Sequence, residues 1–170
     1  ALPEADLDDL CRPRADGTPP FLLAVDGVTD PQNLGALLRT AEAAGVTGVV
    51  LPRHRAVHVT PAVAKAAAGA IEHVPMAVVG GLPAALITAQ QAGVWIVGLV
   101  TDSDDDLFAT NLGDGPVMAV LGAEGAGLSR LVRQRCDVLA TIPMRGELGS
   151  LNVAAAGAVT LFELARQRGA

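Results

Sequence analysis

The chain has 170 residues, 51% of them hydrophobic, and a formal net charge of −6. These values support one well-buried domain, and the negative charge argues against a protein that coats nucleic acid through bulk charge. No apolar run reaches the roughly 18–20 residues that a membrane-spanning helix requires. Cys11 and Cys136 form no CxxC pair and no secretory signal pattern opens the chain, so we expect a reducing, cytoplasmic environment.

Residues 1–20 differ in composition from the rest of the chain. They are acidic and contain several prolines, which is typical of a leader or a linker remnant. We therefore expect the folded domain to span residues 21–170. A leader of this kind is compatible with a piece of a longer protein whose upstream domain is missing.

Strand and helix signals alternate from residue 21 onward. Phe21–Val25 is a short apolar run ended by Asp26-Gly27, which predicts a buried strand, and we expect the next helix to be capped by Asn33 and to end at Gly45. Helices are also expected from about residues 61, 83, 128 and 150. The later predicted strands are Val46–Leu51, Val74–Val79, Val94–Val100, Val117–Leu121 and Val138–Ile142. This order predicts an α/β fold with a mostly parallel sheet flanked by helices.

Three segments place polar or glycine residues directly after predicted strands. They are residues 26–39 (DGVTDPQNLGALLR), 121–129 (LGAEGAGLS) and 142–152 (IPMRGELGSLN). The carboxyl ends of parallel strands share one edge of a sheet, and ligands bind beyond that edge. The polar side chains that we expect to converge there on one cleft are Asn33, Arg39, Glu124, Ser150 and Asn152.

The extended segments 25–45, 120–137 and 142–159 resemble the three sequence motifs of the SpoU (TrmH-like) branch of the SPOUT RNA ribose 2′-O-methyltransferases, in order and in spacing. One such motif alone would be weak evidence, whereas three in register are specific. The Ala-rich stretch at 62–75 and LFELARQR at 161–168 are similar to the enzymes that methylate a guanosine of 23S rRNA. The resemblance implies a C-terminal deep trefoil knot, S-adenosyl-L-methionine as cofactor, RNA as substrate and a homodimer with the site near its interface.

The resemblance also assigns cofactor contacts. Gly122, Ile142 and Leu151 fall where the family holds S-adenosylmethionine, largely through backbone groups and an apolar adenine slot, and Thr101 and Met144 are further candidates. Glycine suits such a role because a backbone without Cβ can approach a ligand closely. Taken alone, the glycines of residues 122–127 would equally indicate a tight turn between a strand and a helix.

In this family the arginine of the first motif, here Arg39, is implied to act on the ribose 2′-hydroxyl. A guanidinium pKa above about 12 makes a literal base hard to defend. We therefore interpret Arg39 as a fork that orients an RNA phosphate and stabilises negative charge on the attacking oxygen, with the proton lost to solvent. The alternative is a surface arginine paired with Glu42.

The other four candidates also carry two interpretations each. Asn33 orients Arg39 or caps its helix, and Glu124 bonds into the site or merely favours a helix N-terminus. Ser150 and Asn152 bind substrate or steady the cofactor loop, while Ser150 is also a natural N-cap. The match to the family motifs favours the site roles.

The last predicted helix, from Leu151 to about Arg168, is apolar around much of its circumference, so we expect it to be buried, partly against a second subunit. The four aromatic residues lie mostly inside apolar patterns and predict no platform for stacking bases, so RNA recognition is expected to depend on phosphate, shape and the 2′-hydroxyl. Related enzymes usually carry a small N-terminal RNA-binding domain that this sequence does not include. The candidate phosphate-binding arginines are Arg53, Arg55, Arg130, Arg133, Arg135, Arg166 and Arg168.

Several rival interpretations remain at this point. A nicotinamide dinucleotide site is disfavoured by the order of the glycines, a tRNA ribose methyltransferase and a catalytically inactive RNA-binding module share the motifs, and no metal site is expected. His54 and His58 have a helical ligand spacing but no third ligand. The acidic run Asp102–Asp106 is interpreted as a solvated loop.

Overall fold

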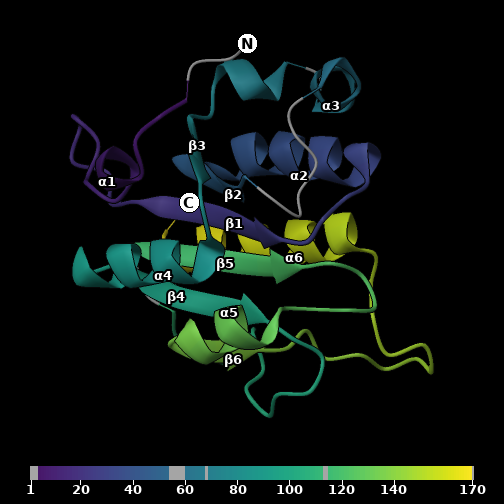
Figure 1. Cartoon of the computed structure of the whole chain (residues 1–170). Helices are drawn as coiled ribbons and strands as arrows, with labels where there is room; N and C mark the ends of the chain where they lie inside the picture. Colours follow the sequence, from purple (N-terminus) through teal and green to yellow (C-terminus); the bar gives the residue numbers. More distant parts are fainter. Residues whose placement is uncertain (1–3, 54–59, 68, 113–114, 170) are drawn as a thin grey trace.

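The computed structural model describes residues 4–53, 60–67, 69–112 and 115–169, so His54, Arg55 and His58 lie outside the described residues. Six strands form one sheet in the order β3-β2-β1-β5-β4-β6, and every neighbouring pair is parallel (Figure 1). The strands are β1 Phe21–Asp26, β2 Gly48–Pro52, β3 Met76–Val79, β4 Trp95–Leu99, β5 Val117–Gly122 and β6 Val138–Ala140. The helices are α1 Leu7–Leu10, α2 Pro31–Ala44, α3 Pro61–Ala67, α4 Leu82–Gln91, α5 Arg130–Arg135 and α6 Val153–Gln167, with a 3₁₀ turn at Ala70–Glu72.

Helices cover both faces of the sheet, as the apolar strands predicted. Side chains alternate along a strand, so Phe21 and Leu23 of β1 pack with α2, α3 and α6, while Leu22 and Ala24 pack with α1, α4 and α5. Every residue of β1 is buried. Figure 1 shows α4 and α5 in front of the sheet and α6 behind it. The predicted α/β fold with a mostly parallel sheet is confirmed.

The ends of several elements differ from the predicted ones. Asn33 does not cap α2; the cap is Asp30, whose carboxylate accepts a hydrogen bond of 2.9 Å from the backbone N of Gln32. Pro31 explains the difference, since proline favours the first helical position and leaves the preceding residue as the cap. Similarly, α6 begins at Val153 with Asn152 as its cap, not at Ser150. β2 and β3 each begin two residues later than predicted, at residues 48 and 76.

Part of the predicted leader packs against the sheet. Leu10 and Cys11 are buried among side chains of α4 and neighbouring strands. The backbone N of Ala5 donates a hydrogen bond of 2.7 Å to the carbonyl of Met76 in the edge strand β3. The described residues of this segment therefore contribute to the core on the α4 side of the sheet.

Close packing fixes α6 against α2 and β5. A Cβ added at Gly157 would lie 2.2 Å from Leu37 Cδ2 and 3.1 Å from Leu121 Cδ1. At its other end α6 is tied to the amino-terminal edge of the sheet, because Arg168 donates hydrogen bonds to the carbonyls of Pro19 (2.7 Å) and Gly115 (2.8 Å) and lies over the ring of Phe21. Arg168 therefore serves the fold and lies at the opposite edge from the strands' carboxyl ends.

The aromatic side chains are more exposed than the sequence predicted. Trp95, Phe108 and Phe162 are each about half exposed, and only Phe21 is fully buried. Trp95 is the first residue of β4, at the end of a strand, and Phe162 lies on the outer side of α6. Their apolar sequence context therefore did not indicate burial.

The α2–α6 contact gives a stability prediction. Leu37→Ala is expected to lower the free energy of unfolding by about 2–5 kcal/mol, because the substitution opens a cavity at a fully buried site. Leu148 is 94% exposed, so Leu148→Ala should change the same quantity by no more than about 0.5 kcal/mol. Urea denaturation measures both, and equal effects of the two substitutions would contradict this packing.

Candidate active site

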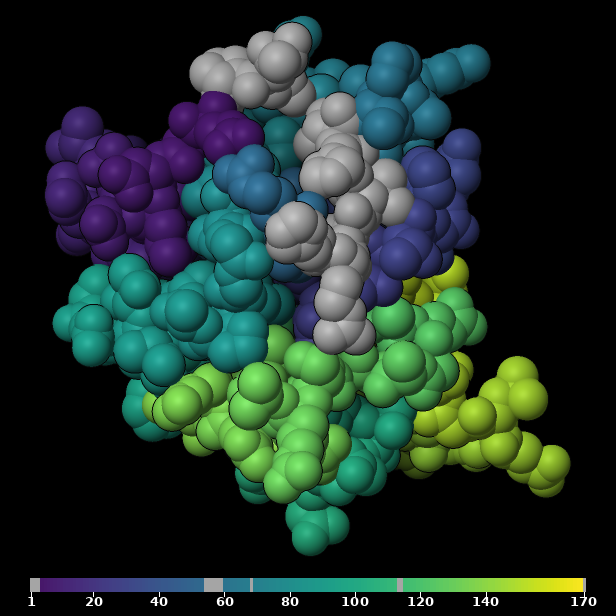
Figure 2. Space-filling view, viewed as in Figure 1, coloured from purple at the N-terminus to yellow at the C-terminus, as the bar shows by residue number. Residues whose placement is uncertain are grey.

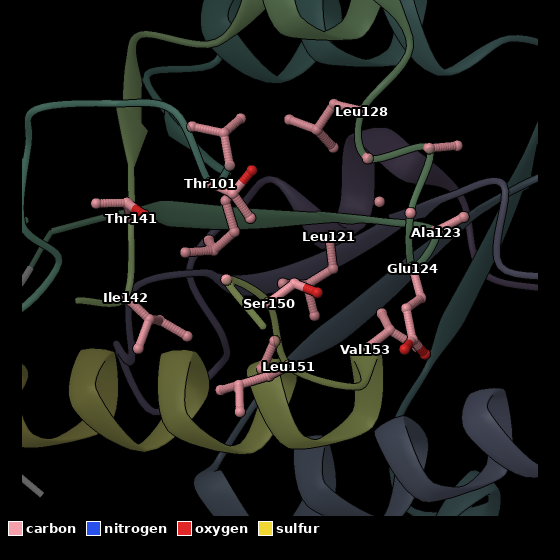
Figure 3. Close-up of a pocket in the computed structure, with 18 of the residues that line it drawn as sticks. Thr101, Leu121, Ala123, Glu124, Leu128, Thr141, Ile142, Ser150, Leu151 and Val153 are labelled. Atoms are coloured by element: carbon pink, nitrogen blue, oxygen red, sulfur yellow. The ribbon is translucent and has the colours of Figure 1, made fainter. Parts of the chain in front are cut away.

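A cavity of about 520 Å³ opens at the carboxyl-terminal edge of the sheet. Its walls come from the ends of β4, β5 and β6, the loop that follows β5, and the segment that leads into α6. Figure 3 shows Thr101 and Leu128 on one side of the cavity and Ile142 and Leu151 on the other. The cavity thus lies at the edge where the sequence predicted a ligand site.

All five residues expected to hold the cofactor line this cavity: Thr101, Gly122, Ile142, Met144 and Leu151. Much of the remaining wall is apolar. The further apolar residues of the lining are Leu99, Val100, Leu121, Ala123, Ala126, Leu128, Leu148, Val153 and Ala156. Such a wall, with a few polar groups, is typical of a small-molecule site.

The loop after β5 is closed tightly on itself. A Cβ at Gly122 would lie 2.3 Å from the backbone carbonyl carbon of Gly127, so only glycine allows this return of the chain. The N–H of Gly127 donates to the carbonyl of Ala123 at 2.8 Å, and Gly127 has a φ of +68°, which favours glycine. The glycines therefore form a tight turn that is also a wall of the cavity.

Asp26 holds this loop from the neighbouring strand. Its buried carboxylate accepts a hydrogen bond of 2.7 Å from the backbone N of Ser129, and its carbonyl accepts one of 3.1 Å from Ala123. Sequence reasoning treated Asp26 only as the end of a strand. A buried carboxylate directly after an apolar strand requires polar partners, and that requirement was the available signal.

Four of the five expected catalytic residues gather at the same edge. Glu124 and Ser150 line the cavity, and Figure 3 shows Ser150 between Leu121 and Leu151. Asn152, just beyond the lining, caps α6 through its Oδ1, and its Nδ2 donates a hydrogen bond of 3.1 Å to Oδ1 of Asn33. The structure therefore joins the first and third motif segments by one side-chain bond.

Arg39 is not part of the cavity wall of its own chain. It lies six residues after Asn33 in α2, which is about 9 Å along the helix axis. Leu37 of α2 packs against Gly157 of α6. Arg39 follows two residues later, which corresponds to a turn of about 200° around the helix axis, so Arg39 faces away from α6. Arg39 is exposed and forms no ion pair with Glu42 or with another residue of the described ranges.

An ion pair on the cavity wall was not anticipated from the sequence. Nη1 of Arg133, in α5, donates to Oδ1 of Asp102, after β4, at 2.8 Å, and both residues line the cavity. The hydrogen bond from Arg133 holds the pKa of Asp102 below its ordinary value. The partners are 31 residues apart in sequence, and no local pattern connects them.

Other arginines of the predicted clusters have partners elsewhere. Arg166 forms a bidentate pair with the buried Glu163 on α6, and Arg53 lies 3.8 Å from Glu4. Across the described ranges, no three His, Cys, Asp or Glu side chains are grouped as a metal site would need, and no helix has the length and apolar character to cross a bilayer.

The Asn33–Asn152 bond gives a prediction that separates a helix cap from a link between segments. Asn152→Ala removes the cap and the link, and should lower the free energy of unfolding by about 1–3 kcal/mol. Asn152→Ser keeps a capping oxygen but is too short to reach Asn33, so it should match Asn33→Ala, at about 0.5–1.5 kcal/mol. The double variant Asn33→Ala/Asn152→Ser should lose no more free energy of unfolding than either single variant, because both single substitutions remove the same hydrogen bond. Additive losses of the two single variants in urea denaturation would contradict the shared bond.

A model of the SpoU rRNA Methylase family matches residues 20–162. The 23S rRNA (guanosine-2′-O-)-methyltransferase of Pseudomonas syringae pv. tomato is 48% identical over 167 residues, which cover 98% of this chain and 66% of that protein. The chain thus spans slightly less than two thirds of that relative.

Solved structures of the same kind superpose closely. The SpoU methyltransferase AviRb from Streptomyces viridochromogenes, in complex with AdoMet, matches with a TM-score of 0.86 and 31% identity, over 99% of this chain and 64% of that one. An AdoMet-bound rRNA methyltransferase from Sinorhizobium meliloti matches with a TM-score of 0.85 and 30% identity, over 96% and 61%. Since the family model covers most of the chain and the fold agrees with these structures, this chain belongs to the SpoU rRNA methylase family.

Proposed function

We propose that this chain is the catalytic domain of an S-adenosylmethionine-dependent methyltransferase that modifies the ribose 2′-hydroxyl of a guanosine in 23S rRNA. The observation that carries the proposal is the cavity, which has all five expected cofactor residues in its wall and Glu124 and Ser150 beside them. Relatives named for this reaction, nearly half identical over most of the chain, support the substrate. An rRNA substrate would place the protein in the cytoplasm.

The cavity fits the proposed cofactor in size and chemistry. Its volume of about 520 Å³ lies within the range of about 300–1,000 Å³ that holds compact ligands. Ile142 and Leu151 offer an apolar slot for an adenine ring, and the Gly122 turn brings backbone close to the ligand without Cβ atoms. Thr101 and Met144 complete the expected contacts. When bound, S-adenosylmethionine supplies an electrophilic methyl group for transfer to oxygen.

The polar residues then position the acceptor. Glu124 and Ser150 border the cavity and can hydrogen-bond a ribose that enters it. Asn33 and Asn152 hold the first turn of α2 against the start of α6, which keeps Ser150 and Leu151 in place. Arg39 orients an RNA phosphate with its guanidinium fork and stabilises negative charge on the 2′-oxygen, and the hydroxyl proton passes to solvent.

The position of Arg39 supports a homodimer as the active form. Arg39 is not in the wall of the cavity of its own chain and has no ion-pair partner in the described ranges, so in our proposal it serves the cavity of a second copy. The outer side of α6 carries an apolar stripe of Ala155, Val159 and the half-exposed Phe162 at helical spacing. We assign this stripe to the dimer interface. The segment before α6 projects from the body of the molecule in Figure 2, and Leu148 of that segment is exposed.

Three further expectations belong to the same proposal. From the sequence pattern we expect a catalytic domain over residues 21–170, with residues 1–20 as a leader or linker remnant, part of which packs on the sheet through Leu10 and Cys11. From the family resemblance we expect a trefoil knot in the C-terminal part. The match of the family model from residue 20 supports the domain. For the knot, support comes from the loop after β5, at residues 123–129, and the segment between β6 and α6, at residues 141–152, which both line the cavity at the carboxyl-terminal edge of the sheet.

The reaction is tested with radiolabelled S-adenosylmethionine and 23S rRNA from ribosomes that lack the modification. We expect label in one guanosine ribose of that RNA, and Arg39→Ala should reduce transfer by about 10²- to 10³-fold while S-adenosylhomocysteine binds as before. Arg12→Ala, at an arginine paired with Asp9 on the distant α1, should retain full activity.

Different results distinguish the alternatives. Label in tRNA instead of rRNA would support a tRNA enzyme, and cofactor binding without transfer to either RNA would support an inactive RNA-binding module. Binding of NAD without binding of S-adenosylhomocysteine would overturn the proposal that the chain transfers a methyl group from S-adenosylmethionine. Full activity of Arg39→Ala would remove Arg39 from its role.

The interface is tested by light scattering. Phe162→Glu introduces a charge into the apolar stripe, so we expect this variant to be monomeric and to lose methyl transfer because Arg39 no longer meets a second cavity. Leu131→Glu changes a side chain that is 59% exposed on α5 and should stay dimeric. A dimeric, active Phe162→Glu variant would place the interface elsewhere.

A further inference from the structure

The Arg133–Asp102 pair lies on the cavity wall but has no part in the mechanism above. It joins the segment after β4 to α5, which follows the glycine loop. Both side chains are partly exposed, at 38% for Arg133 and 66% for Asp102. A pair this exposed contributes little to stability, typically about 0–1 kcal/mol, so its place in the cavity calls for a ligand role.

The two partners have different capacities toward a ligand. Only Oδ1 of Asp102 accepts from Arg133, so Oδ2 keeps its capacity toward a ligand and accepts no bond from another residue of the described ranges. A carboxylate held in this way is a preoriented acceptor for a hydroxyl or an ammonium group. Glu124 is the other carboxylate of the lining, and no arginine of the described ranges pairs with it.

The location of Asp102 favours a hydroxyl of a nucleoside. It follows Thr101 at the end of β4, and Figure 3 shows Thr101 across the cavity from the apolar residues Ile142 and Leu151. A base held in the apolar slot would direct its ribose toward the polar wall. In other parallel α/β sheets, a carboxylate near a strand end accepts hydrogen bonds from a ribose diol.

We propose that Asp102, positioned by Arg133, is the acceptor for the ribose hydroxyls of the bound nucleoside cofactor and determines the selectivity of the site for a ribonucleoside. This inference rests on the proposed function, since it requires that the cavity bind S-adenosylmethionine. Arg133 acts as a positioning residue that touches Asp102, and Asp102 touches the ligand.

The test is calorimetric titration of the full chain with three probes: S-adenosylhomocysteine, methylthioadenosine, which lacks the amino-acid tail, and the 2′,3′-dideoxy form of methylthioadenosine. Asp102→Ala should weaken binding of the first two probes equally, by about 10- to 100-fold, the effect of one or two hydrogen bonds to a charged group. The variant should bind the dideoxy probe as tightly as the parent chain does. Asp104→Ala, at an exposed neighbour outside the lining, should bind all three as the parent does.

The role of Arg133 is read from a double variant. Arg133→Ala should weaken binding of the first two probes by a smaller factor than Asp102→Ala does. The double variant Asp102→Ala/Arg133→Ala should bind these probes no more weakly than Asp102→Ala, because Arg133 acts only through the carboxylate of Asp102. Unfolding curves of each variant verify that the fold is kept.

Three results would overturn the inference. The first is an Asp102→Ala penalty that disappears with methylthioadenosine, since the carboxylate would then contact the ligand's ammonium group. The second is an equal penalty for the dideoxy probe, and the third is unchanged affinity of Asp102→Ala. If the parent chain binds none of the probes, the proposed function itself fails.

Discussion

The contact of α6 with α2 and β5 is the constraint on which the rest of the site depends. Gly157 lets the helix approach Leu37 and Leu121 so closely that a methyl group would not fit without displacement. Because α6 is held there, the segment that leaves β6 must pass the carboxyl end of β4, which lies between β6 and β5 in the sheet. That crossing places residues 148–151 over the cavity and brings Asn152 to Asn33.

The glycine loop, at residues 122–129, is held in place by groups of its own and of the neighbouring strand. Asp26 satisfies the backbone N of Ser129 with a buried carboxylate, and Gly122 lets the loop return onto its own start. Rigid support of this kind matters for a methyl transfer, because the protein contributes mainly by holding donor and acceptor in line. The loop is therefore a well-held wall, whose two ends bond to Asp26 of the neighbouring strand through the backbone N atoms of Ala123 and Ser129.

The sequence predicted those features that follow from local pattern. Apolar runs located all six strands, and the order of strands and helices predicted a parallel sheet with its polar loops on one edge. The family motifs then identified part of the cavity wall, namely Gly122, Glu124, Ile142, Met144, Ser150 and Leu151. Pairings between distant residues had no such signal in the cases of Asp102 with Arg133 and of Asn33 with Asn152. For Asp26, the position after an apolar strand indicated that a polar partner was needed, but not that the partner is Ser129. The direction of Arg39 also depends on which side of α2 meets α6, and residue spacing alone does not determine that side.

The covering of the two sheet edges has a consequence for handling the protein. Residues 103–107 border the end of β6, because the backbone N of Thr141, just after the strand, donates to the carbonyl of Asp105 and the backbone N of Leu107 donates to the carbonyl of Thr141. The edge strand β3 is met by Ala5. Unpaired strand edges promote association between copies. A chain cut back to residue 20, where the family model begins, would uncover the carbonyl of Met76 and the apolar surface beneath Leu10 and Cys11. The amino-terminal segment thus covers surface that promotes aggregation, and we expect a shortened chain to be less soluble than the 170-residue chain.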